Sequence, residues 1–308
     1  MPANDENTRN RAGGGLRVLV VGGASRSAQA FRIHATSQPD FLLTSLVRRP
    51  IPALGSETIH QIADYFAPPE TVLNGSDAVI NFAGITHGPA TGEMQRVNVD
   101  GPVRLAAAAK RAGVRHFVHL SSFHVYGYAE EISNETLENP VTDYARSKQA
   151  ADRALGALAG DDFAVTLLRL PVHYGRGAGA NLRKLAELMK KLGWFPMPYK
   201  AARRSALHVD NLAVVLAEIV RRRLGGIRLA ADPEPFGIDI LAEIVAQQSH
   251  KPIRLIRLPQ ATFVPLRLLS KSLYCRLYRP NLARPEHCIA TAAPFPVALR
   301  DGLTELVR

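Results

Sequence analysis

The sequence predicts an α/β fold: a doubly wound parallel sheet followed by a smaller, mostly helical C-terminal lobe. Three observations predict it. Apolar, β-branched runs alternate with helix-like segments through the first half of the chain, the pattern of parallel strands with helices on both faces. A strand-like run at 16–22 passes directly into a glycine-containing turn and a helix. Beyond Tyr174, longer helices and Pro-rich connectors replace this rhythm.

The predicted strands are short apolar runs, which suit strands that are buried on both faces. In chain order they are 16–22 (LRVLVVG), 41–47 (FLLTSLV), 77–84 (DAVINFAG), 116–122 (HFVHLSS) and 164–172 (AVTLLRLPV). Helical spacing of apolar residues predicts helices at 101–113, 181–193, 209–223 and 239–248. Residues 1–15 are polar and end in three glycines, so we expect a disordered tail there.

Composition excludes several classes of protein. The chain has 308 residues, 46% of them hydrophobic, and no apolar run of the length that a membrane span needs, so we expect a cytoplasmic protein. Its two cysteines, Cys275 and Cys288, form no CxxC pair, and neither a disulfide framework nor a metal site is indicated. The formal charge of +11 favours anionic partners, but no nucleic-acid-binding module accompanies it.

The turn after the first strand, GGASRSA, places Gly22, Ser25 and Ala28 on a G-x-x-G-x-x-G frame. Glycines on such a frame permit a tight turn and let the backbone approach a pyrophosphate at the helix N-terminus. Ser25 adds a side chain at the middle position, although its hydroxyl can donate to a phosphate oxygen. The turn alone fits a nucleotide loop or a plain strand-to-helix connection.

A second motif, YARSK, places Tyr144 and Lys148 four residues apart, on one face of a helix. A lysine ammonium beside a tyrosine favours the phenolate, so we expect the pKa of Tyr144 to be lowered. Such a tyrosine can exchange protons with a sugar hydroxyl. Ser121 and Ser122 end the strand that precedes this helix, where a hydroxyl could hold the same substrate oxygen.

With these motifs, the chain resembles the extended short-chain dehydrogenase/reductases, and within them the NAD(P)-dependent nucleotide-sugar epimerase/dehydratase family. The resemblance covers roughly residues 16–303. It rests on blocks in family order: DAVINFAG, VNVDGPVRLAAAAKRAGVRHFVHLSS, VYG, YARSKQAAD, LLRLPVHYG and RRSALHVDNLA. It implies a Rossmann-type dinucleotide-binding domain over 16–174, a substrate-binding lobe over 175–308 that is interleaved with the sheet, and a homodimer.

The resemblance also implies roles for individual residues. The catalytic residues would be Ser122, Tyr144 and Lys148, and Asn98 would steady the active-site helix. The cofactor would be bound by Gly22, Ser25, Arg26, Ser27, Ala28, Arg48, Asp64, Tyr65, Phe82, Ala83, Gly84, Pro171 and His173. The substrate would be bound by Thr86, Asn181 and Arg204. The short segment between Asn181 and Arg204 resembles the compact bacterial branch that acts on UDP-N-acetyl sugars.

After the second strand, Arg48 and Arg49 stand where an acidic residue would hold the ribose 2′-hydroxyl of NAD. An arginine there suits a 2′-phosphate, which favours NADP over NAD. The alternative is that both arginines are solvated and take no part in binding.

Residues 254–284 are basic and contain no Asp or Glu, and Leu266, Leu269, Leu273 and Leu277 recur at helical spacing within them. We expect an amphipathic basic helix. It could pack its leucines on the core of the lobe while its basic residues, which include Arg276 and Arg279, meet solvent or the substrate diphosphate. Alternatively, it could contact an anionic membrane surface.

His124, His173 and His208 lie in or beside the family blocks, but we expect them to act in packing and hydrogen bonding, and we assign them no catalysis. Trp194 fits either base stacking or core packing.

The sequence thus predicts an NAD(P)-dependent enzyme acting on C4 of a nucleotide-linked sugar: a UDP-N-acetyl-hexosamine or its 4-keto-6-deoxy derivative, in the synthesis of envelope polysaccharide precursors. Epimerase and 4-keto-reductase activities both remain open. The alternative is a non-catalytic NAD(P)-binding sensor or scaffold protein with a degraded glycine loop.

Overall fold

The computed structural model describes residues 14–86, 92–175 and 177–308. Most of the tail predicted over 1–15 therefore lies outside the described residues. The first half contains, in order, β1 (Leu16–Val21), α1 (Arg26–Thr36), β2 (Phe41–Val47), β3 (Thr58–Gln61), α2 (Glu70–Leu73), β4 (Ala78–Asn81), α3 (Glu93–Gln95), the π-helical turn η1 (Arg96–Asp100), α4 (Gly101–Arg111), β5 (His116–Leu120), the 3₁₀ turn η2 (Phe123–Tyr126), β6 (Glu131–Ile132), α5 (Asp143–Gly156) and β7 (Ala164–Arg169).

The second half contains β8 (Val172–Tyr174), α6 (Ala180–Leu192), β9 (Trp194–Pro198), β10 (Arg203–Arg204), β11 (Ala206–His208), α7 (Val209–Arg222), β12 (Gly226–Leu229), β13 (Phe236–Gly237), α8 (Ile238–Ser249), β14 (Arg254–Leu258), η3 (Gln260–Phe263), α9 (Val264–Leu269), α10 (Lys271–Tyr278), β15 (Leu282–Ala283), η4 (Pro285–His287) and α11 (Leu299–Val307). Outside residues 254–284, the strands and helices expected from the apolar runs are present.

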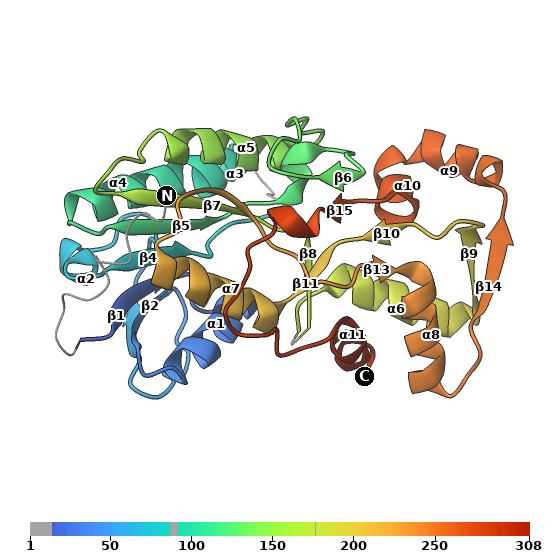
Figure 1. The fold of residues 1–308 in the computed structure, drawn as a ribbon, viewed down its shortest axis with the longest axis horizontal. Coiled ribbons are helices and arrows are strands. Elements are labelled where there is room, and N and C mark those ends of the chain that lie inside the picture. The colour runs from blue at the N-terminus through green and yellow to red at the C-terminus, as the bar shows by residue number, and fades with distance from the viewer. Residues whose placement is uncertain (1–13, 87–91, 176) are drawn as a thin grey trace.

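The central sheet has seven parallel strands in the order β12-β7-β5-β4-β1-β2-β3. Strand β1 shows why it is buried on both faces. Val18 and Val20 pack with α1 and α7 on one side, whereas Leu19 and Val21 pack with α4 and α5 on the other. Because successive strand residues point to opposite faces, a continuous apolar run fills both layers. The predicted doubly wound α/β fold is confirmed (Figure 1).

The chain direction across the sheet reverses between β1 and β4, which are neighbours. In such sheets the crevice outside the carboxyl ends of these two strands binds ligands. Gly22 follows β1 and Ala83 follows β4, so the predicted cofactor residues lie at this point.

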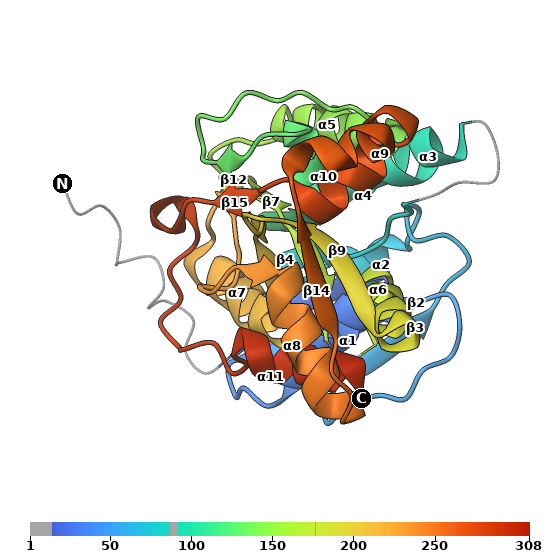
Figure 2. The ribbon, with the colours of Figure 1, turned by 90° about the vertical axis from the view of Figure 1, so that its right-hand side faces the viewer.

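A second apolar cluster joins β8, α6, β9, α8, α10 and α11 beyond the carboxyl end of the sheet (Figures 1 and 2). However, α7 and β12 return to the sheet, with α7 against α1 and β12 beside β7. The interleaving expected from the family is thus visible, while a functional division at 174/175 stays a prediction.

The expected amphipathic basic helix within 254–284 is wrong. This segment contains the strand β14 and two short helices, α9 and α10. The break falls at Ser270, whose hydroxyl caps α10 by accepting a hydrogen bond from the Leu273 N–H. A serine that caps a new helix cannot continue the preceding one, because its backbone has left the helical region. In the described part of the chain, no helix is both long enough and apolar enough to cross a membrane.

Candidate functional site

The loop between β1 and α1 is shaped for close backbone approach. Gly22 has φ +81°, and a Cβ there would stand 3.1 Å from the Ala83 nitrogen, so a larger residue would collide with the chain after β4. Ser25 is the N-cap of α1, and its Oγ accepts a hydrogen bond from the Ala28 N–H at 3.2 Å. The serine that breaks the glycine pattern therefore stabilises the helix start, and its hydroxyl proton can still be donated.

A cavity of about 850 Å³ opens at this crevice. It is lined by eight of the predicted cofactor residues: Gly22, Ser25, Arg48, Asp64, Tyr65, Phe82, Ala83 and Gly84. Arg49, Glu93 and Arg96 also line it. The N-terminus of α1 has no acidic residue in its first turn. A glycine loop, a helix N-terminus and a large cavity lined by three arginines fit a dinucleotide.

The two arginines after β2 belong to this lining. Arg48 and Arg49 are exposed, and neither forms an ion pair with a described residue. The Arg48 guanidinium lies 5.3 Å from the centre of the Tyr65 ring, and its backbone N–H donates to the Tyr65 hydroxyl. Asp64 accepts a hydrogen bond from the Phe66 N–H and so shapes the same turn. Both arginines are available to an anionic ligand group.

Other predicted residues lie outside the lining of this cavity. Ala28 is fully buried and packs in the sheet core. The Arg26 side chain lies against Gly177. Thr86 is exposed beside the undescribed 87–91, and Asn181 is exposed at the start of α6. Trp194 is 43% exposed on β9 and lines neither described cavity. The roles assigned to Arg26, Ser27, Thr86 and Asn181 stay predictions.

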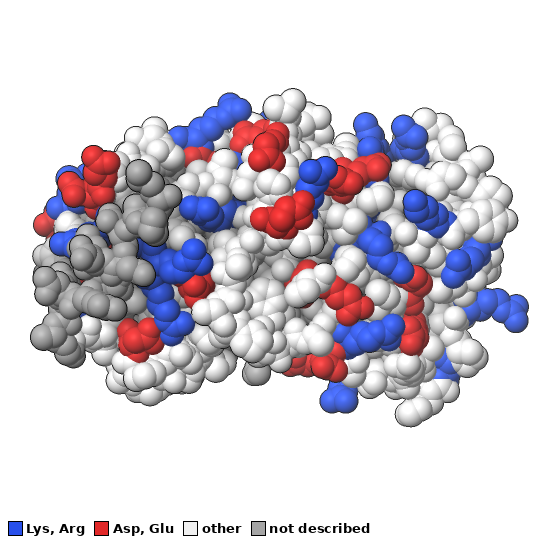
Figure 3. Space-filling model, in the orientation of Figure 1, with Lys and Arg blue, Asp and Glu red and all other residues white. Residues whose placement is uncertain are grey.

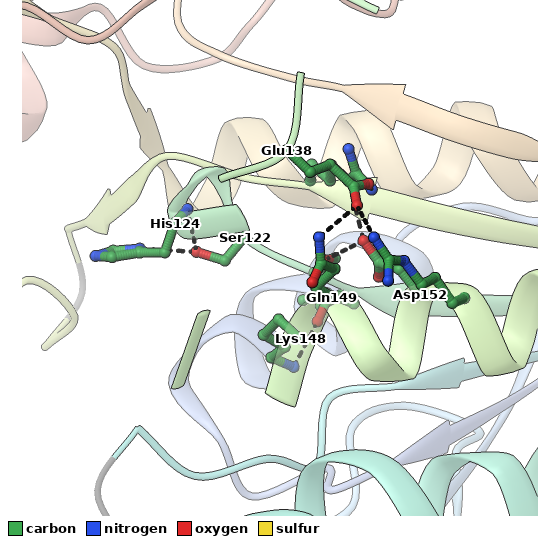
Figure 4. A network of polar contacts seen from close by, with 10 residues as sticks. Ser122, His124, Glu138, Lys148, Gln149 and Asp152 are labelled. Atoms are coloured by element: carbon green, nitrogen blue, oxygen red, sulfur yellow. Dashed lines mark hydrogen bonds and ion pairs between the residues drawn. The ribbon is translucent and has the colours of Figure 1, made fainter. Parts of the chain in front are cut away.

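The proposed catalytic serine and tyrosine meet at the end of β5. Ser122 begins the turn η2, and its Oγ lies 2.9 Å from Nδ1 of His124 (Figure 4). The His124 ring packs edge-on against the Tyr144 ring, 5.6 Å between centroids. Burial lowers the pKa of His124 to about 4, helped by the charges of Arg276 and Arg204. His124 is therefore neutral near pH 7 and can accept the Ser122 proton at Nδ1.

The expected effect of Lys148 on Tyr144 is wrong. Burial raises the pKa of Tyr144, opposed by a hydrogen bond with Ser122 and not by the lysine. The Lys148 ammonium instead donates to the Leu120 carbonyl at 2.8 Å, and burial lowers its own pKa to about 8. The i, i+4 spacing places both residues on one helix face, but it does not fix where a flexible lysine side chain binds.

Lys148 and Asn98 both lie beside Gly84, at the edge of the larger cavity. A Cβ at Gly84, which lines that cavity, would lie 3.5 Å from the Lys148 Nζ and 3.4 Å from the Asn98 Oδ1. Asn98 lies in the π-helical turn η1 and binds both the Ile85 backbone and the Ser147 hydroxyl. It thereby ties α5 to the segment after β4. Burial lowers the pKa of His173 to about 4, with a further contribution from Lys148, which places His173 near this amine.

A buried ion cluster, not anticipated from the sequence, fixes α5. Asp152 accepts hydrogen bonds from Ser121 and from Arg169, each at 2.9 Å (Figure 4). Arg169 also pairs with Glu138, which accepts from Gln149 at 2.8 Å. Asp152 and Arg169 are each 2% exposed. Because Asp152 and Tyr144 lie on one helix, this cluster helps to set where the tyrosine stands.

A second, smaller cavity of about 90 Å³ adjoins the other side of His124. Three arginines line it, Arg204, Arg276 and Arg279, together with residues of η2 and α10, and no carboxylate does. Arg204 is predicted to bind substrate, and its guanidinium donates to the Cys275 and Arg279 carbonyls near the end of α10. Burial lowers its pKa to about 10. Pro171, expected near the nicotinamide, lines this second cavity.

Sequence reasoning missed His124 as a cavity residue, and it left open whether Arg276 and Arg279 meet solvent or the substrate. His124 was visible in the SSFHVYG block, two residues after Ser122, but spacing alone cannot show that its ring turns back to the serine. The two arginines lie more than seventy residues beyond Arg204, and only the folded lobe brings them to it.

A family model, the NAD dependent epimerase/dehydratase family, matches residues 67–226, which is just over half of the chain. The chain belongs to this family. The match begins after the glycine loop, where Ser25 departs from the usual pattern.

Among curated relatives of this family member, an uncharacterized protein y4nL of Sinorhizobium fredii is 31% identical over 56% of the chain and 51% of the relative. A UDP-glucose 4-epimerase of Vibrio cholerae is 27% identical over 60% of each. A ceramide reductase of Caulobacter vibrioides is 27% identical over 79% of the chain and 74% of the relative. The first two matches thus span about half to three fifths of those relatives.

Solved structures match this chain over nearly its whole length. MoeE5 with UDP-glucuronic acid and NAD has a TM-score of 0.73 at 21% identity, covering 94% of this chain and 97% of that one. UDP-glucuronic acid 4-epimerase from Bacillus cereus with NAD has a TM-score of 0.73 at 15% identity, and the match covers 94% of this chain and 96% of that one. A human epimerase family protein with NADPH has a TM-score of 0.70 at 18% identity, and the match covers 95% of this chain and 99% of that one. At these identities the matches establish the fold.

Proposed function

We propose that the protein is an NAD(P)-dependent enzyme that moves a hydride at C4 of a nucleotide-linked sugar. One observation carries the proposal: Lys148 adjoins the larger cavity, His124 lines the smaller one, and Tyr144 and Ser122 connect the two through α5 and η2. Gly84 of the larger cavity adjoins Lys148, which lies one helical turn after Tyr144 on α5. Tyr144 in turn forms a hydrogen bond with Ser122. His124, bound to Ser122, lines the smaller cavity. A substrate oxygen beside Tyr144 would thus lie between the cofactor and an arginine-lined pocket.

NAD(P), when bound, would accept a hydride from the sugar carbon or donate one to it. Tyr144 would take the proton of the sugar hydroxyl during oxidation and return it during reduction. Ser122 would hold the same oxygen by donating its hydroxyl proton to it, while the Ser122 oxygen would accept a hydrogen bond from the Nδ1-protonated tautomer of the neutral His124. Lys148 would hold the nicotinamide ribose and, on leaving the Leu120 carbonyl, would stabilise the phenolate.

The smaller cavity would receive the charged part of the substrate. Arginines bind phosphate oxygens through fixed N–H pairs, and of the three that line this cavity only Arg279 forms an ion pair with a described residue, Glu130. We propose a UDP-sugar, specifically a UDP-N-acetyl-hexosamine or its 4-keto-6-deoxy derivative, used for envelope polysaccharide precursors. The UDP-glucose 4-epimerase relative supports the sugar-nucleotide class.

We further propose that Arg48 and Arg49 favour NADP, which suits a reductase, whereas the NAD-bound neighbours fit an epimerase. A cytoplasmic homodimer remains part of the proposal, and size-exclusion chromatography with light scattering tests the dimer.

Thermal-shift titration with NAD, NADH, NADP and NADPH, each with and without UDP-sugars, tests the function, because a ligand raises the melting temperature according to its affinity. Turnover is followed in parallel by chromatography of the sugar nucleotides. We expect a dinucleotide to stabilise the protein, a UDP-sugar to add to this, and an epimer or reduced sugar to form. Cofactor binding without turnover of any UDP-sugar would instead favour the sensor or scaffold function.

Arg276 offers the sharper substrate variant, since Arg204 also holds α10 in place. Arg276 is exposed and lines the smaller cavity. Arg276→Gln should weaken UDP-sugar binding by about 1.5–3 kcal/mol, the range for a hydrogen bond to a charged group, and leave NAD(P) affinity unchanged. The reverse result would place the diphosphate elsewhere.

A further inference from the structure

Two short helices at the far end of the small lobe expose an unusual amount of apolar surface. Leu268 is 80% exposed and Leu269 is 87% exposed, and Val264 and Leu273 are each 45% exposed. We call these four residues the α9 patch. They lie within ten consecutive residues on α9 and α10. Leu266 and Leu277, in contrast, pack on the core of the lobe. The two helices thus have apolar residues on two sides, one packed on the core and the other turned to solvent.

The surroundings of the α9 patch are positively charged. From 244 to 285 the sequence has eight Lys or Arg and no Asp or Glu. Arg254, Arg257, Arg267 and Lys271 are exposed, and none of them forms an ion pair with the residues that the structure describes. Figure 3 shows blue and white atoms, without red, around the corner of the molecule that carries α9. Lys271 lies over the Tyr128 ring and Arg257 donates to the Tyr199 carbonyl, but neither contact neutralises their charge. Exposed leucines among cations without a carboxylate partner match the chemistry of an anionic bilayer surface.

The same two-helix segment also forms a wall of the smaller cavity. Ser272, Cys275 and Arg276 of α10 line that cavity, one helical turn or less from Leu273 of the α9 patch. A surface that receives the α9 patch would therefore lie beside this cavity.

We propose that the α9 patch docks the protein on anionic lipid bilayers, with Leu268 and Leu269 inserted at the interface and Arg254, Arg257, Arg267 and Lys271 against the headgroups. A second copy of the chain is the less favourable occupant. In a two-fold dimer the same patch faces itself, so these cations would be brought together with no carboxylate of the segment to offset them. The docking is independent of catalysis and of the proposed substrate.

Vesicle co-sedimentation of the full chain tests the proposal. Vesicles of phosphatidylcholine alone are compared with vesicles of phosphatidylcholine and phosphatidylglycerol, at low and high salt. We expect binding to the anionic vesicles, and weaker binding as salt screens the headgroup attraction. The Leu268→Ser, Leu269→Ser double variant should bind roughly tenfold less, because burial of the leucine methylene groups contributes to interfacial partitioning.

Leu137→Ser is the matched control, since Leu137 is 86% exposed in the loop before α5, outside the α9 patch. It should bind vesicles as the wild type does. The Arg254→Gln, Arg267→Gln variant should lose the preference for anionic vesicles. Equal vesicle binding by the leucine double variant and the wild type, or no wild-type binding to anionic vesicles, would overturn the proposal. A dimer that the leucine double variant dissociates, without vesicle binding, would assign the α9 patch to a second copy.

Discussion

Single side chains decide the chemistry that this site can perform, and Tyr144 is the first of them. It is buried, it contacts Ser122 and His124, and its pKa is raised while Lys148 is bound to Leu120. A proton donor is therefore already in position, and the base form requires the lysine to move toward it.

Tyr144→Phe should lower turnover by about 10²–10⁴-fold, the usual contribution of general acid–base catalysis. Cofactor binding should change little, because Tyr144 does not line the larger cavity. Product formation and thermal shift with NAD(P) measure the two effects separately. A variant within twofold of wild-type turnover would remove the tyrosine from the mechanism.

The two arginines after β2 decide the choice of cofactor. If they bind a 2′-phosphate, NADPH should bind at least tenfold more tightly than NADH, a difference of about 1.4 kcal/mol. The Arg48→Ala, Arg49→Ala variant should erase the preference, and Arg48→Asp with Arg49→Ala should reverse it. Exposed Arg104 on α4, replaced by Ala, is the control. Equal affinities of the wild type at low salt would mean that both arginines are solvated, and an epimerase that retains NAD would then be favoured.

At the scale of elements, α5 is the part on which the site depends most. The Asp152–Arg169 pair and Glu138 hold it to the strands β5 and β7, and Asn98 holds it to the segment after β4. A shift of α5 would move Tyr144 and Lys148 together.

Arg169→Met should lower the free energy of unfolding by about 3–5 kcal/mol, because it leaves the buried Asp152 carboxylate without its cation. Arg153→Ala is the matched change on the same cluster, since that arginine contacts Glu138 at 3.5 Å with 71% of its side chain exposed. It should change stability by less than about 1 kcal/mol. Urea denaturation measures both, and similar losses in the two variants would contradict a buried, structural role for the cluster.

The elements also show where sequence reasoning works. Buried parallel strands and long helices were predictable, because their apolar runs are continuous or strictly periodic. Strand β3 (Thr58–Gln61) and strand β12 (Gly226–Leu229) lie at the two edges of the sheet, where one-sided burial leaves little apolar pattern. The cap at Ser25 and the break at Ser270 depend on one hydroxyl each, and the buried cluster joins residues as far apart as Ser121 and Arg169, so only the folded chain displays them.

At the scale of the whole molecule, buried histidines couple stability to pH. Burial lowers the pKa values of His116, His124 and His173 to about 4, and that of His119 well below its ordinary value. Between pH 6.5 and about 4 the unfolded chain therefore binds more protons than the folded one, and stability falls as pH falls.

Each such histidine adds up to about 1.4 kcal/mol per pH unit to this loss. The raised pKa values of Asp152 and Asp232 act in the opposite sense at the acidic end. Urea denaturation at pH 7 and pH 5 should show a less stable protein at pH 5. His116→Asn, which can keep a hydrogen bond to Thr166, should reduce the slope. A stability independent of pH in this window would mean that these rings are protonated in the folded protein.

The return of the chain from the small lobe to the sheet has a consequence for any attempt to divide the molecule. Separation after residue 174 would remove β12 from the edge of β7 and α7 from the face that also packs α1. The N-terminal fragment would then present an unpaired strand edge and an uncovered apolar sheet face, both of which promote aggregation. The two fragments should therefore be insoluble when they are produced separately, and they should assemble with each other when they are produced together. The two lobes are thus one folding unit and cannot be exchanged as separate modules.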